Sequence, residues 1–215
     1  MIKIAEKSNE KVVFNTDIPI SLANAIRRSI NSIPILAIDE LEISKNDSAL
    51  YDEVIAHRMG LVPIKNPDLK LPEDCSCNGK GCNKCSIKYK LKAKGPCTVY
   101  SDELSPKGDV SYKMPITILD KDQELEFVAI AKMGIGENHA KFSPGLFFYK
   151  YKDDVDDLEI NDEKFKKLVE STGKDNNQEL IVEIESWGQL NAKDIFIKAV
   201  DTLNKDIKEF SKQIK

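Results

Sequence analysis

The sequence predicts a protein of mixed helices and strands, because both characteristic spacings of apolar residues occur in it. Residues 87–94 alternate strictly between apolar side chains and lysine, a period of two that is typical of a strand with one buried face. Residues 195–214 instead place apolar side chains three and four apart, which is the spacing of one helix face. With 215 residues, 41% apolar and 32% charged, the chain can bury one large core or two smaller ones.

The first quarter of the chain is expected to alternate strands with helices. Strand material lies at 2–4 and 12–14, and a helix is predicted over 21–33. Ser21 is a suitable N-terminal cap for this helix, and Pro34 ends it. The next two elements are a strand over 36–44, whose alternation contains one slip, and a helix over 48–59.

Later segments are shorter until the last one. Glycines and prolines mark 66–84 as a loop, and 153–163 carries seven acids and no base, which indicates a solvated connector. Asn191 and Asp194 resemble a capping pair for a final helix of about 24 residues, roughly 36 Å long at 1.5 Å per residue. Strands are predicted over 87–94, 97–101, 114–119, 124–132 and 180–185.

The apolar stripe of the final helix needs a cover. Burying five of its large side chains would contribute about 10 kcal/mol as an upper estimate, comparable with the net stability of a whole domain. Leaving the stripe in water would forfeit that stabilisation. The stripe is therefore expected to pack on the chain's own sheet or on a partner protein, and the sequence leaves both open.

Four of the five cysteines fall within eleven residues, at Cys75, Cys77, Cys82 and Cys85. The odd total and the absence of a secretory signal pattern disfavour a disulfide framework. Four thiolates at this spacing, with glycines for the turns, predict a closed tetrahedral site for a structural Zn²⁺. Six lysines and no acid over 80–94 would lower the thiol pKa values and stabilise the metal-bound form.

Two other interpretations of the cluster stay open. An iron–sulfur cluster is one, although the spacing matches no common ferredoxin run, and four reduced thiols without a ligand role is the other. Cys97 lies outside the cluster and is expected to be a simple buried thiol.

Composition and motifs argue against several functions. The net charge of −4 disfavours strong independent binding to nucleic acid, although the lysine face of 88–94 is a weak candidate. The longest apolar stretch, 33–38, is far too short to span a membrane, and without a secretion signal we expect a cytoplasmic protein. Only two histidines occur, and no nucleophile motif or phosphate-binding loop accompanies them, so no catalytic residue is predicted.

Several strings of residues carry a family resemblance. In the first third they are Asn24-Ala-Ile-Arg27-Arg28, Ala37-Ile-Asp39 and Asp52-Glu-x-Ile-Ala-x-Arg58-x-Gly60-x-Val-Pro63-Ile64. Together they resemble the alpha-type assembly subunits of DNA-directed RNA polymerase, a family that includes bacterial alpha, its archaeal counterpart of the D type and the eukaryotic third-largest subunit. Two later strings, His139-Ala-Lys-Phe-Ser-Pro144 and Glu183-Ile-Glu-Ser-Trp-Gly188, look like the archaeal and eukaryotic members. The resemblance thus covers nearly the whole chain.

This resemblance implies an α+β fold in two domains. The chain ends, 1–44 and 176–215, would form a dimerisation domain of sheet and long helices. Residues 45–175 would form a β-rich inserted domain that carries the cysteine loop at 75–85. A subunit of this kind is a non-catalytic scaffold within a nucleotidyltransferase complex. It pairs with archaeal subunit L, and the pair forms the assembly platform for the large catalytic subunits, which hold the magnesium.

The resemblance also implies where partners bind. The helices over 21–33 and 191–213 would form the interface with subunit L, and the paired arginines would face the large subunits. DNA and RNA would be contacted only through the complex, and no membrane is involved. The candidate interface residues are Arg27, Arg28, Ile26, Ile30, Leu203, Ile207 and Phe210.

The chain departs from parts of the family pattern, and two other functions compete. Many archaeal members carry a cysteine-bearing ferredoxin-like insertion before the final strand, but 153–178 contains no cysteine, so no iron–sulfur cluster is expected there. No DNA-binding C-terminal domain of the bacterial kind is expected either. The competing hypotheses are an independent zinc-binding nucleic-acid protein, using the cysteine loop and the lysine face, and a thiol redox protein.

Overall fold

The computed structural model describes residues 2–65, 69–77, 80–152 and 179–214. Contacts within the chain divide it into two compact units. Met1–Ile33 and Pro144–Lys215 form the first, here called the terminal unit, and Pro34–Ser143 form the second, the insert unit. Each unit combines antiparallel sheet with helix, so the α+β class predicted above is present. Within the described ranges, no helix is both long enough and apolar enough to cross a lipid bilayer.

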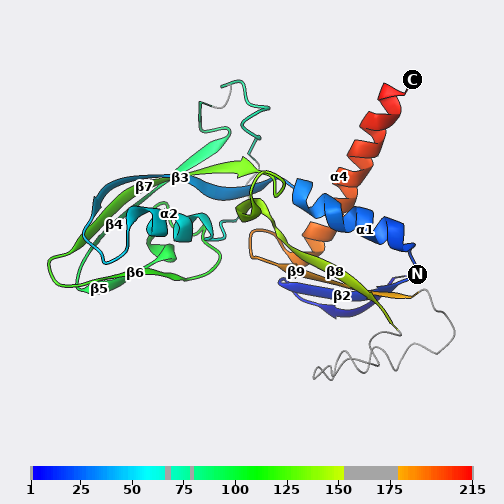
Figure 1. Cartoon of the computed structure of the whole chain (residues 1–215), viewed down its shortest axis with the longest axis horizontal. Helices are drawn as coiled ribbons and strands as arrows, with labels where there is room; N and C mark the ends of the chain where they lie inside the picture. Colours follow the sequence, from blue (N-terminus) through cyan, green and yellow to red (C-terminus); the bar gives the residue numbers. More distant parts are fainter. Residues whose placement is uncertain (1, 66–68, 78–79, 153–178, 215) are drawn as a thin grey trace. The chain divides into compact units, whose positions relative to one another are not determined.

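The terminal unit is built on an antiparallel sheet with the strand order β1-β2-β9-β8 (Figure 1). Strand β9 lies in the middle, so that Val182 pairs with Phe14 on one side and with Tyr149 on the other. Segments from both ends of the sequence therefore share one sheet. The strands are β1 (Lys3–Lys7), β2 (Lys11–Thr16), β8 (Gly145–Tyr151) and β9 (Leu180–Ser186).

Two helices, α1 (Ile20–Ser29) and α4 (Ala192–Gln213), pack against each other and against this sheet. Both lie on the same face of the sheet in Figure 1. The rings of Phe14 on β2 and Phe196 on α4 meet edge to face, with their centroids 5.3 Å apart. Ile195 and Ala199 are fully buried, so the first half of α4 supplies the core of this unit. A 3-10 turn, η1 (Ile30–Ser32), follows α1 directly.

The insert unit contains a longer sheet with the order β3-β7-β4 and a separate pair, β5-β6. Its core lies between these sheets and helix α2, around the side chains of Leu36, Ile55, Tyr89 and Phe127. Along β4 the side chains of Tyr89, Leu91 and Ala93 are buried, Ile87 is half-buried and the lysines are exposed, as the alternation in the sequence predicts. The strands are β3 (Ile35–Asn46), β4 (Ser86–Lys94), β5 (Cys97–Tyr100), β6 (Pro115–Leu119) and β7 (Glu124–Gly134). The helical elements are α2 (Asp52–Gly60), η2 (Ser101–Glu103) and η3 (Ala140–Phe142).

The slip in the alternation of β3 corresponds to a change of register. Ile38 pairs with Ala131 and Glu40 pairs with Ile130, which leaves Asp39 without a cross-strand partner. A β-bulge of this kind bends the strand and turns one side chain to a new direction. It therefore places the Asp39 carboxylate where other parts of the insert unit can reach it.

The observed boundaries differ from the expected ones in two ways. The units divide at 33/34 and 143/144, whereas the resemblance suggested 44/45 and 175/176. All of β3 pairs with β7, which draws 35–44 into the insert unit, and β8 pairs with β9, which draws 145–151 into the terminal unit. Strand β8 was not predicted from the sequence at all. The acidic segment 153–163 lies outside the described residues.

Helix starts also shift by a few residues. Helix α1 begins at Ile20 after Pro19, whose carbonyl accepts hydrogen bonds from the N–H groups of Leu22 and Ala23. Ser21 is therefore inside the helix rather than its cap. Helix α2 begins at Asp52 rather than at 48, because the Asn46 side chain donates to the Leu50 carbonyl and holds the preceding residues in a turn.

Candidate functional site: a four-cysteine cluster and a convergence of motifs

The four clustered cysteines of the insert unit bring their sulfur atoms together. All four Sγ atoms lie within 4.8 Å of one another. The Sγ distances are 3.5 Å between Cys75 and Cys82, 3.5 Å between Cys77 and Cys85, and 3.8 Å between Cys82 and Cys85. Four sulfurs placed tetrahedrally at about 2.3 Å from one ion would lie about 3.8 Å apart. These sulfur separations are thus close to those of a four-coordinate metal site.

Tight turns fold the chain around the cluster. The Cys82 carbonyl accepts hydrogen bonds from the N–H groups of Cys85 and Ser86, each 2.9 Å long. The Cys82 N–H in turn points at the Cys85 sulfur, 3.4 Å away. Gly81, at φ +81°, supplies the left-handed backbone that ordinary residues avoid. These contacts hold the last two cysteines in place through the backbone.

Contacts among the sulfurs shift the pKa values of two of the thiols in opposite directions. Hydrogen bonds from neighbouring thiols, the strongest from Cys85, lower the pKa of Cys77 to about 6. The pKa of Cys85 moves the opposite way, to about 12, because burial and the bonds to the other sulfurs outweigh the stabilising Cys82 N–H. Without a cation, the negative charge of the Cys77 thiolate therefore disfavours a second thiolate at Cys85. A divalent cation at the centre would remove this conflict by stabilising all four thiolates together.

A metal ion held by all four cysteines would have a structural role. Protein sulfur fills every position around a tetrahedral ion, so none is open to a substrate or an attacking water. Cys97 lies apart from the cluster on β5 and is half-buried, and its thiol donates to the Lys94 carbonyl at 3.5 Å. The structure gives it no role.

Three of the strings singled out in the sequence converge in the insert unit. Asp39 comes from the bulge in β3, Gly60 from the end of α2, and Lys141 from η3. The Lys141 ammonium lies 2.6 Å from Asp39 Oδ1. A Cβ placed on Gly60 would lie 3.5 Å from the Ile38 carbonyl and 3.9 Å from the Lys141 side chain. Residues more than a hundred positions apart thus form one packed junction.

Asp39 is the electrostatic centre of this junction. Burial, the largest single influence, raises the pKa of its carboxyl group, but the hydrogen bond and charge of Lys141 and the charge of Lys132 outweigh it. The net result is a pKa below the ordinary value of an aspartate. Lys132 also forms an ion pair with Glu40, the residue that follows Asp39. The junction is therefore a small network of alternating charges.

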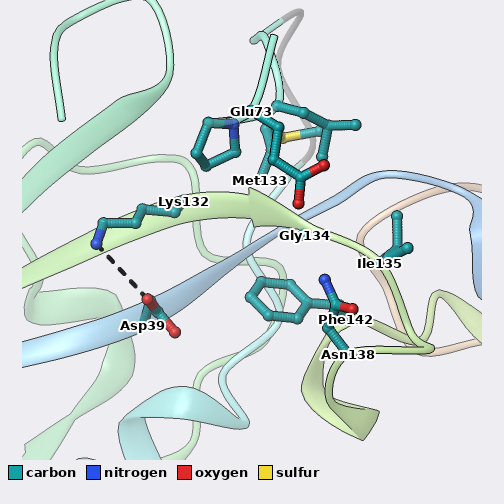
Figure 2. A pocket seen from close by; sticks show the side chains of 10 residues that line it. Asp39, Glu73, Lys132, Met133, Gly134, Ile135, Asn138 and Phe142 are labelled. Atoms are coloured by element: carbon teal, nitrogen blue, oxygen red, sulfur yellow. Dashed lines mark ion pairs between the residues drawn. The ribbon is translucent and has the colours of Figure 1, made fainter. Parts of the chain in front are cut away.

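A cavity of about 200 Å³ lies beside this network, within the insert unit (Figure 2). One wall is the end of β7 with η3, and the opposite wall is Leu71, Pro72 and Glu73, which lead into the cysteine loop. The Phe142 ring packs directly on Gly134, where a Cβ would approach it to 2.7 Å. Nothing in the sequence had indicated this cavity, because its walls are far apart along the chain.

The predicted interface residues of α1 divide into buried and exposed ones. Ile26 and Ile30 are 5% and 3% exposed, so they belong to the core of the terminal unit. Arg27 and Arg28 are exposed, and the Arg27 guanidinium donates two hydrogen bonds, of 2.9 and 3.1 Å, to the side-chain oxygen Oδ1 of Asn24. Other apolar side chains of this helix that reach solvent are Ile20 and Leu22.

The predicted residues at the far end of α4 are largely exposed. Leu203 is half-buried, Ile207 is 57% exposed and Phe210 is 63% exposed. Ile214, one turn further, is 69% exposed. Figure 1 shows this end of α4 extending past α1. The stripe is thus covered by the chain's own sheet in its first half and open in its second half.

Comparison with known proteins gives consistent matches. The model of the family described as RNA polymerase Rpb3/RpoA insert domain matches residues 12–145. A protein of Pyrococcus horikoshii named DNA-directed RNA polymerase subunit Rpo3 is 38% identical over 85% of this chain and 73% of its own length. A protein of the same name from Methanocaldococcus jannaschii is 34% identical over 100% of this chain and 97% of its own length.

The chain belongs to the alpha-type Rpo3 family of DNA-directed RNA polymerase subunits. A third relative of the same name, from Thermococcus kodakarensis, is 37% identical over 84% of this chain and 72% of its own length. The family recognised from the motifs is thus confirmed. The matched range 12–145 contains the whole insert unit, including the cysteine cluster and the junction around Asp39.

The lysine face of β4 is not a uniform basic surface. Lys92 pairs with Glu126 at 2.7 Å, and Lys94 pairs with Glu124 at 3.2 Å. Both acids lie on the neighbouring strand β7 and offset the positive charge. Phosphate binding depends on an excess of cations, so this pairing does not favour an independent nucleic-acid surface here.

Proposed function

We propose that the chain is a non-catalytic scaffold subunit of a cytoplasmic DNA-directed RNA polymerase, a nucleotidyltransferase complex whose chemistry is performed by other subunits. In this role it pairs with subunit L, and the pair provides the assembly platform for the large catalytic subunits. The observation that carries the proposal is the exposed second half of the α4 stripe, in a chain that belongs to a polymerase subunit family.

The exposed apolar side chains at the end of α4 favour a protein partner on this stripe. The exposed apolar side chains at the end of α4 lie on one helix face, because they are spaced three and four residues apart. A row of large apolar side chains left in water gives up about 1.5–3 kcal/mol for each one that burial would cover. Large apolar areas of this kind are typical of obligate interfaces between subunits. The exposed side chains are Ile207, Phe210 and Ile214, and the half-buried Leu203 precedes them on the same face.

The exposed side chains of α1 extend the same surface in this proposal. Ile20 and Leu22 are 42% and 41% exposed, and α1 packs directly on α4. Ile26 and Ile30 contribute indirectly, because their burial in the core holds α1 in position. Arg27 and Arg28, which point to solvent, are assigned to contacts with a large subunit, where the planar guanidinium groups can bind carboxylates.

The cysteine cluster is assigned a structural Zn²⁺. The close approach of the four sulfurs and the all-thiolate ligand set support zinc over harder cations. Bound zinc would fix the loop that leads from α2 to β4, and so it would shape the surface that the insert unit offers to neighbouring subunits. The metal has no catalytic part in this proposal.

The test is pairing between the full chain and subunit L of the same organism. Wild-type protein is expected to form a stable one-to-one complex, measured by light scattering and by titration. Ile207→Glu with Phe210→Glu should weaken the complex roughly 1,000-fold, since two central apolar anchors at about 2 kcal/mol each sum to about 4 kcal/mol, and each 1.4 kcal/mol is about tenfold in affinity. Because both side chains are exposed in the free chain, circular dichroism should show unchanged helix content.

A matched control carries two charge changes on the other side of the same helix. Lys205→Glu with Lys212→Glu alters residues about half a turn away from the stripe, and it should leave the affinity within a few-fold of wild type. The proposal is overturned if wild-type chain stays monomeric beside subunit L. It is also overturned if the two double variants lose affinity equally.

A further inference from the structure

The cavity beside the Asp39 junction is smaller than a typical cofactor site. At about 200 Å³ it falls below the roughly 300–1,000 Å³ that usually holds a drug-sized ligand. A space of this size suits one large side chain. Interfaces between proteins often centre on single arginine or aromatic side chains that enter such pockets.

We propose that this cavity binds one arginine or lysine side chain from a neighbouring polypeptide of the assembly. This inference rests on the proposed function, which makes the chain part of a multi-subunit complex. The site would receive the charged tip at its acidic rim and the aliphatic stem along its apolar walls.

The walls supply the apolar part of the match. Met133, near the end of β7, and Ile135, just after the strand, line one side, with the Phe142 ring beside them. Leu71 and Pro72 face them from the segment before the cysteine loop. Arginine and lysine bury long aliphatic stems while their charged ends stay near water, so a half-apolar pocket suits them.

The charged residues at the rim of the cavity determine which charge the ligand should carry. Among the lining residues the charged ones are Asp39, Glu73 and Lys132. Asp39 already holds Lys132 and Lys141, and Lys132 is shared with Glu40. Within the part of the chain that the structure describes, no ion pair reaches Glu73, and Figure 2 shows its carboxylate turned towards β7 at Gly134. Glu73 is therefore the acid available to an incoming cation.

The same wall connects the cavity to the metal site. The Asp74 N–H donates to the Leu71 carbonyl at 3.1 Å, and the Cys75 N–H donates to the Pro72 carbonyl at 3.4 Å. These bonds tie Leu71, Pro72 and Glu73 to the first cysteine of the cluster. We therefore expect the cavity to bind its ligand more weakly when the metal is removed.

The four methionines of the chain provide a direct measurement. Full-length, zinc-loaded protein carrying ¹³C-methyl methionine would be titrated with N-acetyl-arginine amide. Met133 lines the cavity, whereas Met59 and Met114 do not and serve as internal references. The expected result is a saturable shift of the Met133 methyl signal at millimolar ligand, with smaller changes in the references. N-acetyl-citrulline amide, which is similar in shape but neutral, should produce at least a three-fold weaker effect.

Glu73→Gln should weaken binding of the arginine probe at least three-fold, and Asp74→Asn is the matched control. Asp74 is the next acid along the chain, is exposed and does not line the cavity, so its loss should change little. Removing zinc with a chelator should also weaken the Met133 response. Loss of the response in both carboxylate variants would indicate a general charge effect and would overturn the assignment.

Three other outcomes would overturn the proposal. They are an unmoved Met133 signal, equal binding of the citrulline probe, and stronger binding of N-acetyl-leucine amide, which would indicate an apolar occupant. A separate measurement of pairing with subunit L tests the proposed function independently of the cavity. Glu73→Gln should leave that pairing unchanged, because the cavity lies in the insert unit and the α4 stripe in the terminal unit. Failure of the probe therefore leaves the scaffold proposal standing, and failure of pairing is detected separately.

Discussion

Asp39 owes its surroundings to the break in register of β3. In a regular strand it would pair with a residue of β7 and point away from one face of the sheet. The bulge instead turns its carboxylate towards Lys141 on η3, 2.6 Å away, and towards Lys132 at 3.7 Å. The sequence contained the signal, since the alternation of apolar residues slips there, but it did not reveal which side chains would meet the aspartate.

Asp39→Asn should lower the free energy of unfolding by about 1 kcal/mol at pH 7, because a partly exposed ion pair contributes about that much. The pKa of Asp39 is lowered in the folded protein, so its stabilisation is present above the unfolded value near 4 and is lost as pH falls below it. The difference between wild type and variant should therefore shrink at pH 3. Urea unfolding at both pH values measures it.

Glu42→Gln provides the control for this prediction. Glu42 is exposed on the same strand, and its neutralisation should change the stability by less than about 0.5 kcal/mol. An Asp39→Asn penalty of the same size at pH 7 and pH 3 would show that the charge of the carboxylate has no part in the stability.

At the scale of elements, the contact between η3 and the end of β7 is the tightest one in the junction. The Phe142 ring occupies the space that a side chain at position 134 would need. This contact orients η3, and with it Lys141. The sequence could not show it, because η3 is too short to have a pattern of its own.

Gly134→Ala should destabilise the insert unit by about 1–3 kcal/mol, since its methyl group would overlap the Phe142 ring and force one of them to move. Urea unfolding, followed by the Met133 and Met59 methyl signals, measures the change. Gly60→Ala is a suitable comparison, because its methyl group would meet its nearest neighbour at an ordinary 3.5 Å. Equal stability of the two variants would contradict the packing argument.

Strand β8 was not predicted from the sequence, for a different reason. Large apolar and aromatic side chains follow one another from Leu146 to Tyr149, so the sequence shows no alternation of apolar and polar residues there. What makes it a strand is its neighbour, because β9 offers a full row of backbone partners from Leu180 to Ser186. The aromatic residues of β8 have a high strand propensity, and the tertiary contact with β9 supplied the pairing that no periodicity had indicated.

At the scale of the whole molecule, the two units should respond separately to loss of the metal. All four clustered cysteines lie in the insert unit, while the single tryptophan, Trp187, lies in the terminal unit. Chelation should therefore lower the unfolding midpoint reported by the Met133 and Met59 signals. The midpoint reported by Trp187 fluorescence should change little.

The loss of stability on chelation should have a measurable size, and the release of the metal should depend on pH. Each kcal/mol lost shifts the midpoint of a domain of this size by roughly 4–8 °C. Because the thiols must lose their protons to bind, zinc should also be released more readily as the pH falls from about 7.5 to about 5. A dye assay for free zinc measures that release. Equal shifts of both signals on chelation would contradict separate responses of the two units.

The sequence by itself determined the α+β class, most strands and helices, the four-cysteine cluster and the family. Each of these depends on a local period, a short spacing or a string of residues that can be read along the chain. The tertiary structure decided where the units divide, that Ile26 and Ile30 face inward while Ile207 and Phe210 stay exposed, and that a cavity forms beside Asp39. Those features depend on contacts between segments far apart in sequence, and periodicity carries no information about which distant segment covers a given face.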